Sequence, residues 1–370
     1  MTISIVKGAP GHYRMAEGVL DDMEELLAEL GVEKIHIVTG KRAWHAARPY
    51  LPNQLIENSN LGFTYIEGFC TLQTVDEIAS KLSSTDAVIG IGGGTVLDIA
   101  KAAAIKADVK SVLIPTIAAT CAAWTPISVF YDENGTFTHF TEFPLANTLV
   151  LIEPKIIAES PVQYLRAGIG DTLAKFYEAD ALVDSFYKDR AIPVWLQVSQ
   201  LSAKICKDIL LENGQDAIAA VTTGTVTQEL VNVIEAVIMT GGMVGGFGGK
   251  LGRSAGAHSI HNGLTEAEEV KDVLHGKLVA YGILVQLALE EKDDEVVKLM
   301  DYYREWGLPI SLGDMGVNSE NEQLLKRVVE KATLPNETIH FMNQKVTEEA
   351  VLSAMRKVEV LQKDNKLIHT

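Results

Sequence analysis

The sequence has few cysteines, and their spacing points neither to disulfides nor to a cysteine-based zinc site. Only Cys70, Cys121 and Cys206 occur, and no two of them form a CxxC pair. Disulfide-stapled secreted domains and structural zinc sites need more cysteines at closer spacing. We therefore expect three reduced thiols in a cytoplasmic protein.

Positive charge and long apolar runs are also scarce. The chain carries 32 Lys and Arg against 49 Asp and Glu, for a formal net charge of −17, which argues against nucleic acid or an anionic membrane as the main partner. It contains no stretch of about 18 uninterrupted apolar residues, so we expect no membrane-spanning helix. The start, MTISIVKGAPGHY, lacks the charged segment and apolar run of a signal peptide.

The 370 residues, 47% of them hydrophobic, allow a large core and suggest two domains. In the first 150 residues, strand-like runs alternate with helix-like segments, which predicts a parallel sheet covered by helices on both faces. The strand-like runs are EKIHIVTG, FTYIEGF, DAVIGIGGG, KSVLIPT and TLVLIEP; the helix-like segments include AEGVLDDMEELLAELG, TVDEIASKL and TVLDIAKAAAIKA. The first of these helices is expected to end at Gly31.

Two features interrupt or end this pattern. Alternating runs around Asp132–Gly135 predict a β-hairpin near residues 127–140. After about Pro161 long helical patterns dominate, such as PVWLQVSQLSAKICKDILLEN. We therefore predict an α/β domain over residues 1–160 and an all-helical domain over residues 161–370.

A glycine-rich loop follows one predicted strand and opens a helix. It runs Gly90-Ile-Gly92-Gly93-Gly94-Thr95, and in this context glycines let backbone N–H groups approach a phosphate. The dinucleotide fingerprint GxGxxG is not met, because Thr95 occupies the third glycine position. Asp98 follows in the first helical turn, where a carboxylate interacts well with the helix dipole. A tight turn without a ligand is the alternative.

Three histidines suggest a cation site in the helical half. His258 and His261 lie three residues apart in RSAGAHSIHNGLT, and His275 opens the helix LHGKLVAYG. Two imidazoles and one carboxylate can hold Zn²⁺ or Fe²⁺ with an open position. Asp171, at what looks like a helix start after a glycine-rich turn, is a candidate for the carboxylate. HxxH spacing alone is weak evidence, and satisfied core or surface histidines are the alternative.

Lys175 lies one helical turn after Asp171 in AGIGDTLAKFYEA. The pair is either a surface ion pair or an acid and a base inside a pocket.

These motifs, in this order, resemble the iron-containing alcohol dehydrogenase superfamily and its glycerol dehydrogenase branch. The resemblance rests on GIGGGTVLDIAKA, PTIAATCAAWTPISVFYDENG, AGIGDTLAKFYEA, AHSIHNGLT and LHGKLVAYGILVQ. It implies a Rossmann-like domain, a helical domain, an active site in the cleft between them, and a homo-oligomer. It implies a divalent metal, Zn²⁺ or Fe²⁺, on Asp171, His258 and His275, with His261 beside the site. It also implies nucleotide contacts from Gly92, Gly93, Gly94, Thr95, Asp98, Thr116, Ala119, Thr120, Thr125, Ile127 and Tyr131.

The chain departs from the glycerol dehydrogenase pattern in three places. Cys121 stands where those enzymes carry an aspartate that can bind polyol hydroxyls, and we expect the adjacent Trp124 to narrow an apolar pocket. Lys175 takes a position that resembles a metal-ligand position in the iron enzymes, where its ammonium could anchor a substrate carboxylate or partly replace the metal.

The third departure lies at the end of the second predicted strand. Gly40, Lys41 and Arg42 stand where NAD enzymes hold the ribose with an acid. Two basic residues there favour NADP(H) over NAD(H), although a solvated basic turn that still accepts NAD is the alternative.

The sequence thus predicts a metal-dependent oxidoreductase that transfers a hydride between NAD(P)(H) and a small 2-oxo acid or 2-hydroxy acid. A glycerol dehydrogenase using NAD is the alternative within the same chemistry. A lyase like dehydroquinate synthase and a nucleotide-binding protein without metal are weaker alternatives. The first would need more basic residues around its motifs than this chain shows.

Overall fold

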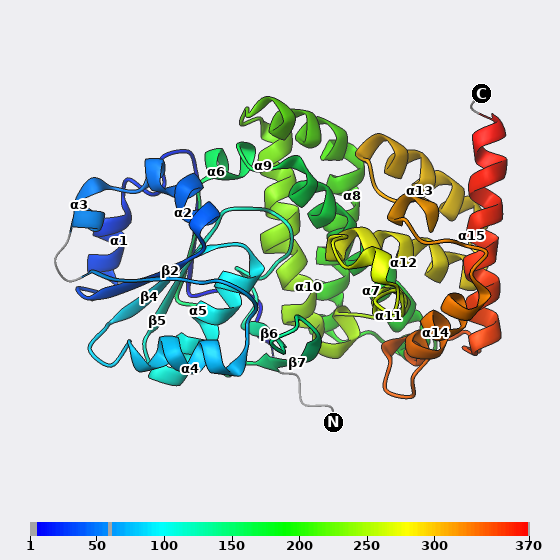
Figure 1. Cartoon of the computed structure of the whole chain (residues 1–370), viewed down its shortest axis with the longest axis horizontal. Coiled ribbons are helices and arrows are strands. Elements are labelled where there is room, and N and C mark those ends of the chain that lie inside the picture. Colours follow the sequence, from blue (N-terminus) through cyan, green and yellow to red (C-terminus); the bar gives the residue numbers. More distant parts are fainter. Residues whose placement is uncertain (1–5, 58–60, 369–370) are drawn as a thin grey trace. The chain divides into compact units, whose positions relative to one another are not determined.

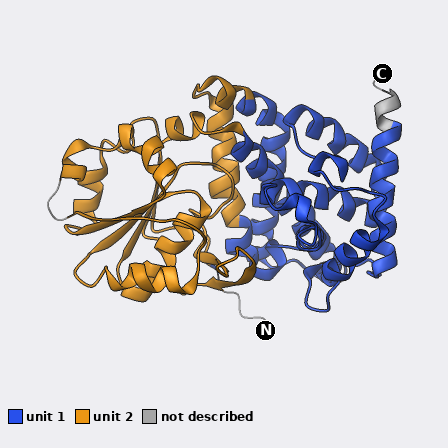
Figure 2. Ribbon diagram, in the orientation of Figure 1, with its two compact units in different colours: residues 1–6, 163–218, 244–370 blue, residues 7–162, 219–243 orange. Residues whose placement is uncertain are grey.

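The computed structural model describes residues 6–57 and 61–368 (Figure 1). The first five residues, which belong to the segment tested for a signal peptide, lie outside the described part. The chain divides into two compact units (Figure 2). Unit 1 comprises residues 1–6, 163–218 and 244–370, and unit 2 comprises residues 7–162 and 219–243.

Unit 2 is built on a six-stranded parallel sheet in the order β1-β8-β5-β4-β2-β3. Its strands are β1 (His12–Met15), β2 (Ile35–Thr39), β3 (Leu61–Tyr65), β4 (Ala87–Gly92), β5 (Lys110–Pro115) and β8 (Leu149–Ile152). The helices and turns of the same segment are α1 (Met23–Glu29), α2 (Lys41–Ala47), η1 (Arg48–Tyr50), α3 (Asn53–Glu57), α4 (Leu72–Ser80), α5 (Gly94–Ala107) and α6 (Pro154–Ala158). The predicted parallel sheet is confirmed.

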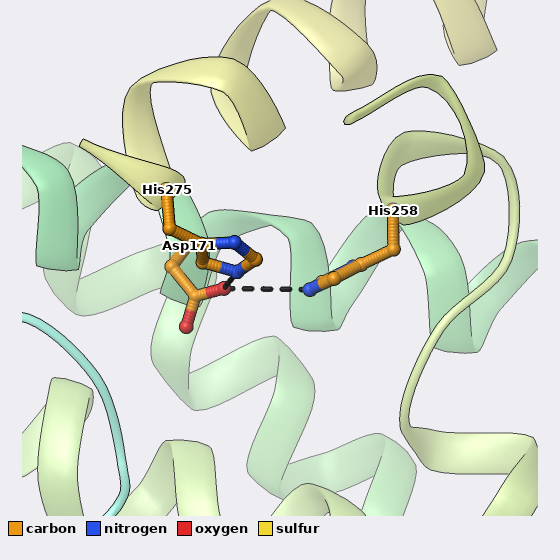
Figure 3. Close-up of side chains that lie close together, drawn as sticks. All are labelled: Asp171, His258 and His275. Carbon is orange, nitrogen blue, oxygen red and sulfur yellow. Dashed lines mark ion pairs between the residues drawn. The ribbon is translucent and has the colours of Figure 1, made fainter. Parts of the chain in front are cut away.

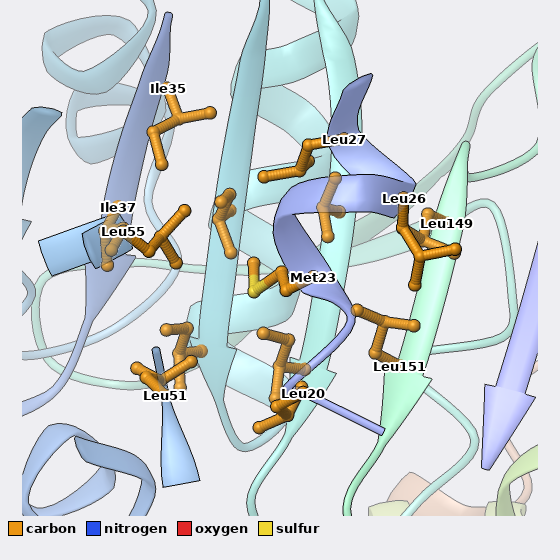
Figure 4. Close-up of a cluster of buried hydrophobic side chains, with 14 of the residues drawn as sticks. Leu20, Met23, Leu26, Leu27, Ile35, Ile37, Leu51, Leu55, Leu149 and Leu151 are labelled. Atoms are coloured by element: carbon orange, nitrogen blue, oxygen red, sulfur yellow. The ribbon is translucent and has the colours of Figure 1, made fainter. Parts of the chain in front are cut away.

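The strands β2, β4, β5 and β8 are buried on both faces, which is why they are continuous apolar runs in the sequence. Ile89 and Ile91 of β4 join a core cluster with Met23 of α1 (Figure 4). Gly90, between them, points to the opposite face, where an added Cβ would lie 2.7 Å from the Cβ of Ala100 on α5. The alternation along β4 therefore places one helix on each face of the sheet.

The order of the strands creates a switch point between β2 and β4. The chain runs outward from β2 to β3 and then returns to place β4 on the other side of β2. The Thr39 hydroxyl at the end of β2 donates to the carbonyl of Ile91 on β4 at 2.8 Å. In open parallel sheets, ligands bind outside the carboxyl ends of the strands at such a point.

The antiparallel hairpin lies where the sequence predicts one. It pairs β6 (Ile127–Tyr131) with β7 (Phe137–Glu142). The Asp132 carboxylate accepts the N–H groups of Asn134 and Thr136, and Gly135 adopts φ +82°. These local bonds close the turn.

Unit 1 is helical in its described part. Helices that begin in or belong to it are α7 (Val162–Tyr187), α8 (Val194–Thr223), α11 (Gly256–Leu264), α12 (His275–Leu289), α13 (Asp293–Trp306), α14 (Glu322–Ala332) and α15 (Glu348–Ile368). Short helical turns are η3 (Gly249–Gly252), η4 (Glu268–Val270), η5 (Gly313–Met315) and η6 (Thr338–Phe341). The helical stretch before η3 begins in unit 2, whose residues 219–243 include α9 (Gln228–Glu235) and η2 (Ala236–Thr240). It continues through α10 (Gly241–Gly248), along which the chain passes into unit 1.

That stretch, Gln228–Gly252, is long and apolar enough to cross a membrane by length and composition alone, with a mean hydropathy of 1.6 in its most apolar window. Because 61% of that window is buried within the protein, it has the character of a core helix.

Two local expectations are wrong. Asp171 does not start a helix after a glycine-rich turn but lies inside the 26-residue α7, which contains Gly168 and Gly170. The helix predicted to begin near residue 16 starts only at Met23, because Gly18 adopts φ +79° and its N–H donates to the Glu153 carboxylate at 2.6 Å.

Candidate functional site

Three side chains from three helices of unit 1 converge on one point. Asp171 of α7 lies with its Oδ1 3.5 Å from Nε2 of His258 on α11 and 3.3 Å from Nε2 of His275 at the start of α12 (Figure 3). One ligand atom from each residue lies within 4.8 Å of the others. Two imidazole nitrogens and one carboxylate oxygen so arranged match the donors of a Zn²⁺ or Fe²⁺ centre with an open position.

Close backbone packing of α7 against α12 brings Asp171 and His275 together. A Cβ at Gly276 would lie 1.8 Å from the carbonyl oxygen of Ala167, and a Cβ at Gly170 would lie 2.4 Å from the carbonyl oxygen of Gly276. No larger residue fits at either glycine without moving a helix. Gly170 and Gly276 therefore set the distance between the helices that carry these two donors.

Asp171 is buried, with a side chain 5% exposed, and is held as an anion. Burial alone raises the pKa of its carboxyl, but the Lys175 ammonium and hydrogen bonds from His258 and His275 outweigh burial and hold the pKa well below its usual range. Lys175 lies with Nζ 3.9 Å from Oδ2 of Asp171, and its side chain is only 12% exposed. The surface ion-pair interpretation of the two residues is therefore wrong.

Glu178, which we did not predict from the sequence, fixes His258. Its fully buried carboxylate accepts the N–H groups of Ala255 and His258 at 2.7 and 2.9 Å, and it lies 2.7 Å from Nδ1 of His258. Burial lowers the pKa of His258, but Glu178 and Asp171 outweigh burial and raise it to about 9. Because Asp171 and Glu178 are seven residues apart on α7, the spacing of two helical turns was the available signal.

His261 lies beside the cluster without facing Asp171 directly. Its Nε2 is 2.9 Å from Nδ1 of His275, and its Nδ1 is 3.0 Å from Oδ1 of Asn262. Burial, followed by the charges of His275 and His258, lowers the pKa of His261 well below its usual range. Its ring is therefore neutral, so one of its nitrogens donates a hydrogen bond and the other accepts one.

The residues predicted to bind a nucleotide gather in unit 2 at the carboxyl edge of the sheet. Gly93 caps α5 without a side-chain hydrogen bond, which leaves backbone N–H groups at the helix start available to an anion. Added Cβ atoms would lie 2.8 Å from Val96 at Gly92 and 2.9 Å from Ile117 at Gly93, whereas Gly94 has room. The close packing around this loop therefore requires glycine at Gly92 and Gly93.

Residues after β5 lie next to this loop. The N–H of the buried Thr116 donates to the carbonyl of Gly92 at 3.1 Å, and Thr120 Oγ1 lies 3.8 Å from the Cβ position of Gly94. Ala119 lies half-buried in the same segment, and Thr95 is exposed at the start of α5.

Asp98 is buried and bound within the protein. Its carboxylate pairs with Lys101 at 2.8 Å and accepts the N–H of Val129 at 3.0 Å. Lys101 in turn donates to the carbonyls of Ala122, Thr125 and Ile127. These bonds hold the segment before β6 in place. Tyr131 is half-buried at the end of β6, and burial raises its pKa. The structure thus shows Asp98 supporting the loop rather than presenting its carboxylate to a ligand.

Gly40, Lys41 and Arg42 lie at the end of β2 beside the switch point. Lys41 Nζ forms an exposed ion pair with Glu67 at 2.6 Å. An acid, Glu67, therefore reaches this turn from the segment after β3.

Trp124 does not line an open pocket in unit 2. It is buried, its indole N–H donates to the carbonyl of Gly8 at 2.8 Å, and its ring packs edge-on against Tyr13. A Cβ at Gly242 would lie 2.5 Å from the indole. The prediction that Trp124 narrows a substrate pocket is wrong, because the side chain is a core residue. Cys121 is half-buried three residues earlier, and its carbonyl accepts the Trp124 N–H at 3.0 Å.

Comparison with known proteins agrees with this architecture. Residues 10–154 match the family described as iron-containing alcohol dehydrogenase. The chain is 37% identical over 358 residues to hydroxycarboxylate dehydrogenase A of Escherichia coli K12, covering 96% of this chain and 98% of that one. The chain belongs to the iron-containing alcohol dehydrogenase family.

Other members of the iron-containing alcohol dehydrogenase family align along almost the whole chain. A glycerol dehydrogenase of Thermotoga maritima is 33% identical over 360 residues, covering 95% of each chain. The crystal structure of glycerol dehydrogenase from Schizosaccharomyces pombe is similar with a TM-score of 0.89 at 26% identity, covering 100% of this chain and 93% of that one. These relatives confirm the expectation of an oxidoreductase that acts on CH–OH groups.

Proposed function

We propose that this protein transfers a hydride between NAD(P)(H) and a small 2-oxo acid or 2-hydroxy acid, with one divalent metal on Asp171, His258 and His275. The observation that carries the proposal is the donor cluster with Lys175 beside it. Both ring nitrogens that face Asp171 are Nε2 atoms, and the carboxylate is held as an anion, so the donor set fits a divalent cation. A metal bound there would supply Lewis-acid polarisation of the substrate oxygen.

The two carboxylate oxygens of Asp171 face different partners. Oδ1 of Asp171 faces the two histidines, and Oδ2 faces the Lys175 ammonium. A 2-oxo acid carries a carboxylate one carbon from its reacting carbonyl. Lys175 can therefore anchor the substrate carboxylate while the carbonyl oxygen lies at the donor cluster. This pairing favours an anionic substrate over glycerol.

The nucleotide belongs to unit 2 in this proposal. The N–H groups at the start of α5 and the glycines before it offer a pyrophosphate site at the switch point. Arg42, with Lys41 once Glu67 is displaced, offers cations to a 2′-phosphate, so NADP(H) is favoured over NAD(H). A cytoplasmic location, a homo-oligomer and a shared active-site cleft stay predictions.

Glycerol oxidation with NAD is the second candidate function. Relatives named glycerol dehydrogenase support it, among them the Thermotoga maritima protein at 33% identity. Half-buried Cys121 in place of an aspartate argues against it, because a thiol accepts hydrogen bonds from polyol hydroxyls poorly.

Steady-state rates test the substrate. We expect kcat/KM for 2-oxobutanoate or 2-oxoglutarate with NADPH to exceed that for glycerol with either oxidised nucleotide. Lys175→Met keeps much of the side-chain length and removes the charge. It should lower kcat/KM for 2-oxo acids by about 10- to 100-fold, mainly through KM, and affect an uncharged aldehyde much less.

Equal losses on charged and uncharged carbonyls would contradict carboxylate anchoring by Lys175. A clear preference for glycerol with NAD would instead favour the second candidate. Lys204→Met, which removes a cation from the exposed face of α8, is the matched control and should leave all rates unchanged.

A further inference from the structure

Asn262 and Glu337 form the start of a hydrogen-bond chain that leads to the donor cluster. The Asn262 Nδ2 lies 3.1 Å from both carboxylate oxygens of Glu337. An ionised carboxylate only accepts hydrogen bonds, so the amide nitrogen of Asn262 must face Glu337. The amide oxygen is thereby turned the other way, toward His261.

This orientation determines which nitrogen of His261 carries the proton. Oδ1 of Asn262 can only accept, and it lies 3.0 Å from Nδ1 of His261. In the neutral ring the proton therefore resides on Nδ1, and Nε2 keeps its lone pair. That lone pair faces Nδ1 of His275 at 2.9 Å.

The chain ends at His275. Because Nε2 of His261 accepts, Nδ1 of His275 donates, and Nε2 of His275, 3.3 Å from Oδ1 of Asp171, is the nitrogen left to face the cation. We propose that Glu337, acting through Asn262 and His261, sets the tautomer of His275 so that its Nε2 can bind the cation. The proposal rests on the metal site of the proposed function, and it makes Asn262 and His261 positioning residues.

The two histidine donors thus have separate carboxylate anchors. Glu178 on α7 fixes His258 directly, whereas Glu337, just before η6, acts on His275 through two intervening side chains. Contacts between a ring N–H and a partner outside the metal site hold ligands in orientation and tautomer, and their loss typically costs 10- to 100-fold in metal affinity. A wrong tautomer would point an N–H at the cation.

Two variants separate the relay from simple packing. Asn262→Leu keeps a similar volume and removes the acceptor for Nδ1 of His261. The double variant Asn262→Asp with Glu337→Gln reverses the hydrogen bond between the two positions but still presents an acceptor to His261. Asn343→Leu is the matched control, because Asn343 also donates to a carboxylate, Asp184, outside the cluster.

The relay is read directly by the ¹⁵N chemical shifts of the neutral His261 ring in metal-free protein. We expect a single Nδ1–H form in the wild type, the double variant and the control, and a mixture in Asn262→Leu. Zn²⁺ alone, titrated against a competing chelator, should bind Asn262→Leu 10- to 100-fold more weakly and the double variant within about threefold of wild type.

An unchanged Nδ1–H form of His261 in Asn262→Leu would overturn the relay, as would loss of that form in a folded double variant. Thermal unfolding of the metal-free proteins verifies that each is folded. If no form binds Zn²⁺, the proposed metal site fails, and the nitrogen shifts still decide whether the relay exists.

Discussion

The Glu178 carboxylate lies 2.7 Å from Nδ1 of His258 and accepts that residue's backbone N–H at 2.9 Å. The same side chain therefore holds both the backbone at the start of α11 and the ring that extends from it. Because a carboxylate can only accept, Nδ1 must donate, and Nε2 is left to face Asp171. One buried residue of α7 thus sets the tautomer and the orientation of a histidine that lies 80 residues later in the sequence.

Replacing Glu178 with glutamine should invert the tautomer of His258. The variant keeps the shape and an oxygen for the backbone N–H groups of Ala255 and His258, which turns its NH₂ group toward Nδ1 of His258. Nδ1 must then accept, and Nε2 carries the proton. We expect Zn²⁺ affinity to fall about 10- to 100-fold, measured by chelator competition.

The matched control is Glu359→Gln, a carboxylate outside the donor cluster that accepts the N–H of Leu312 and the hydroxyl of Tyr281. It should leave Zn²⁺ affinity unchanged. Wild-type affinity in Glu178→Gln, with the fold intact, would show that the tautomer of His258 does not depend on Glu178.

Gly276→Ala should disturb the approach of α12 to α7. The added Cβ would lie 1.8 Å from the carbonyl oxygen of Ala167, so a helix must shift. Overpacking of this kind typically costs about 1–3 kcal/mol, and a backbone contact belongs at the upper end. Urea unfolding at pH 7 measures the loss.

Gly313→Ala is the control for this change. The nearest atom to its added Cβ is Ser311 Oγ at 3.6 Å, so it should change the free energy of unfolding by less than about 1 kcal/mol. Similar losses in both variants would contradict this account.

The parallel sheet could be predicted because strands buried on both faces are continuous apolar runs. β1, His12–Met15, was missed because its four residues alternate between exposed and half-buried and carry no such run. The late start of α1 could not be seen either. It depends on a hydrogen bond from Gly18 to Glu153, 135 residues away in the sequence.

The donors Asp171, His258 and His275 were found from residue types that bind metals and from the resemblance to a known family. Their supporting residues were not, because Glu178 and Glu337 act on side chains 75 to 80 residues distant. Trp124 was misplaced for the opposite reason. Its place three residues after Cys121, where the chain departs from the glycerol dehydrogenase pattern, suggested a pocket, and only the packing of Gly242 and Tyr13 against its ring shows that it is core.

Removing Glu67 should improve binding of a 2′-phosphate. Glu67→Gln frees Lys41 from its exposed ion pair at the end of β2. Since exposed pairs contribute at most about 1 kcal/mol, we expect 2′,5′-ADP to bind up to about fivefold more tightly at low salt, with little change for 5′-AMP. Isothermal titration calorimetry measures both ligands.

The control for this change is Asp76→Asn, which frees Lys106 from a similar exposed pair between α4 and α5. It should leave both affinities unchanged. If Glu67→Gln affects the two nucleotides equally, the ribose phosphate does not lie near Lys41.

The stability of unit 1 should depend on pH through Glu295. Burial alone raises the pKa of this carboxyl, but hydrogen bonds from Tyr177 at 2.6 Å and Lys207 at 3.2 Å outweigh burial and lower the pKa below its ordinary value of 4.5. A carboxyl with a lowered pKa in the folded state stabilises the fold above the pKa of the unfolded chain. That contribution is lost as pH falls through the lower, folded-state pKa.

Glu295→Gln should therefore lower the free energy of unfolding at pH 7 by about 1 kcal/mol, the size of a charged hydrogen bond at a partly solvated site. The difference from wild type should persist down to about pH 5 and shrink below about pH 4.5, as urea unfolding across this range would show. Asp208→Asn, which removes an exposed ion pair with Lys204 on the neighbouring stretch of α8, should change stability by only a few tenths of a kcal/mol. A gap between wild type and Glu295→Gln that stays constant down to pH 3 would mean that the carboxylate contributes through packing and not through its charge.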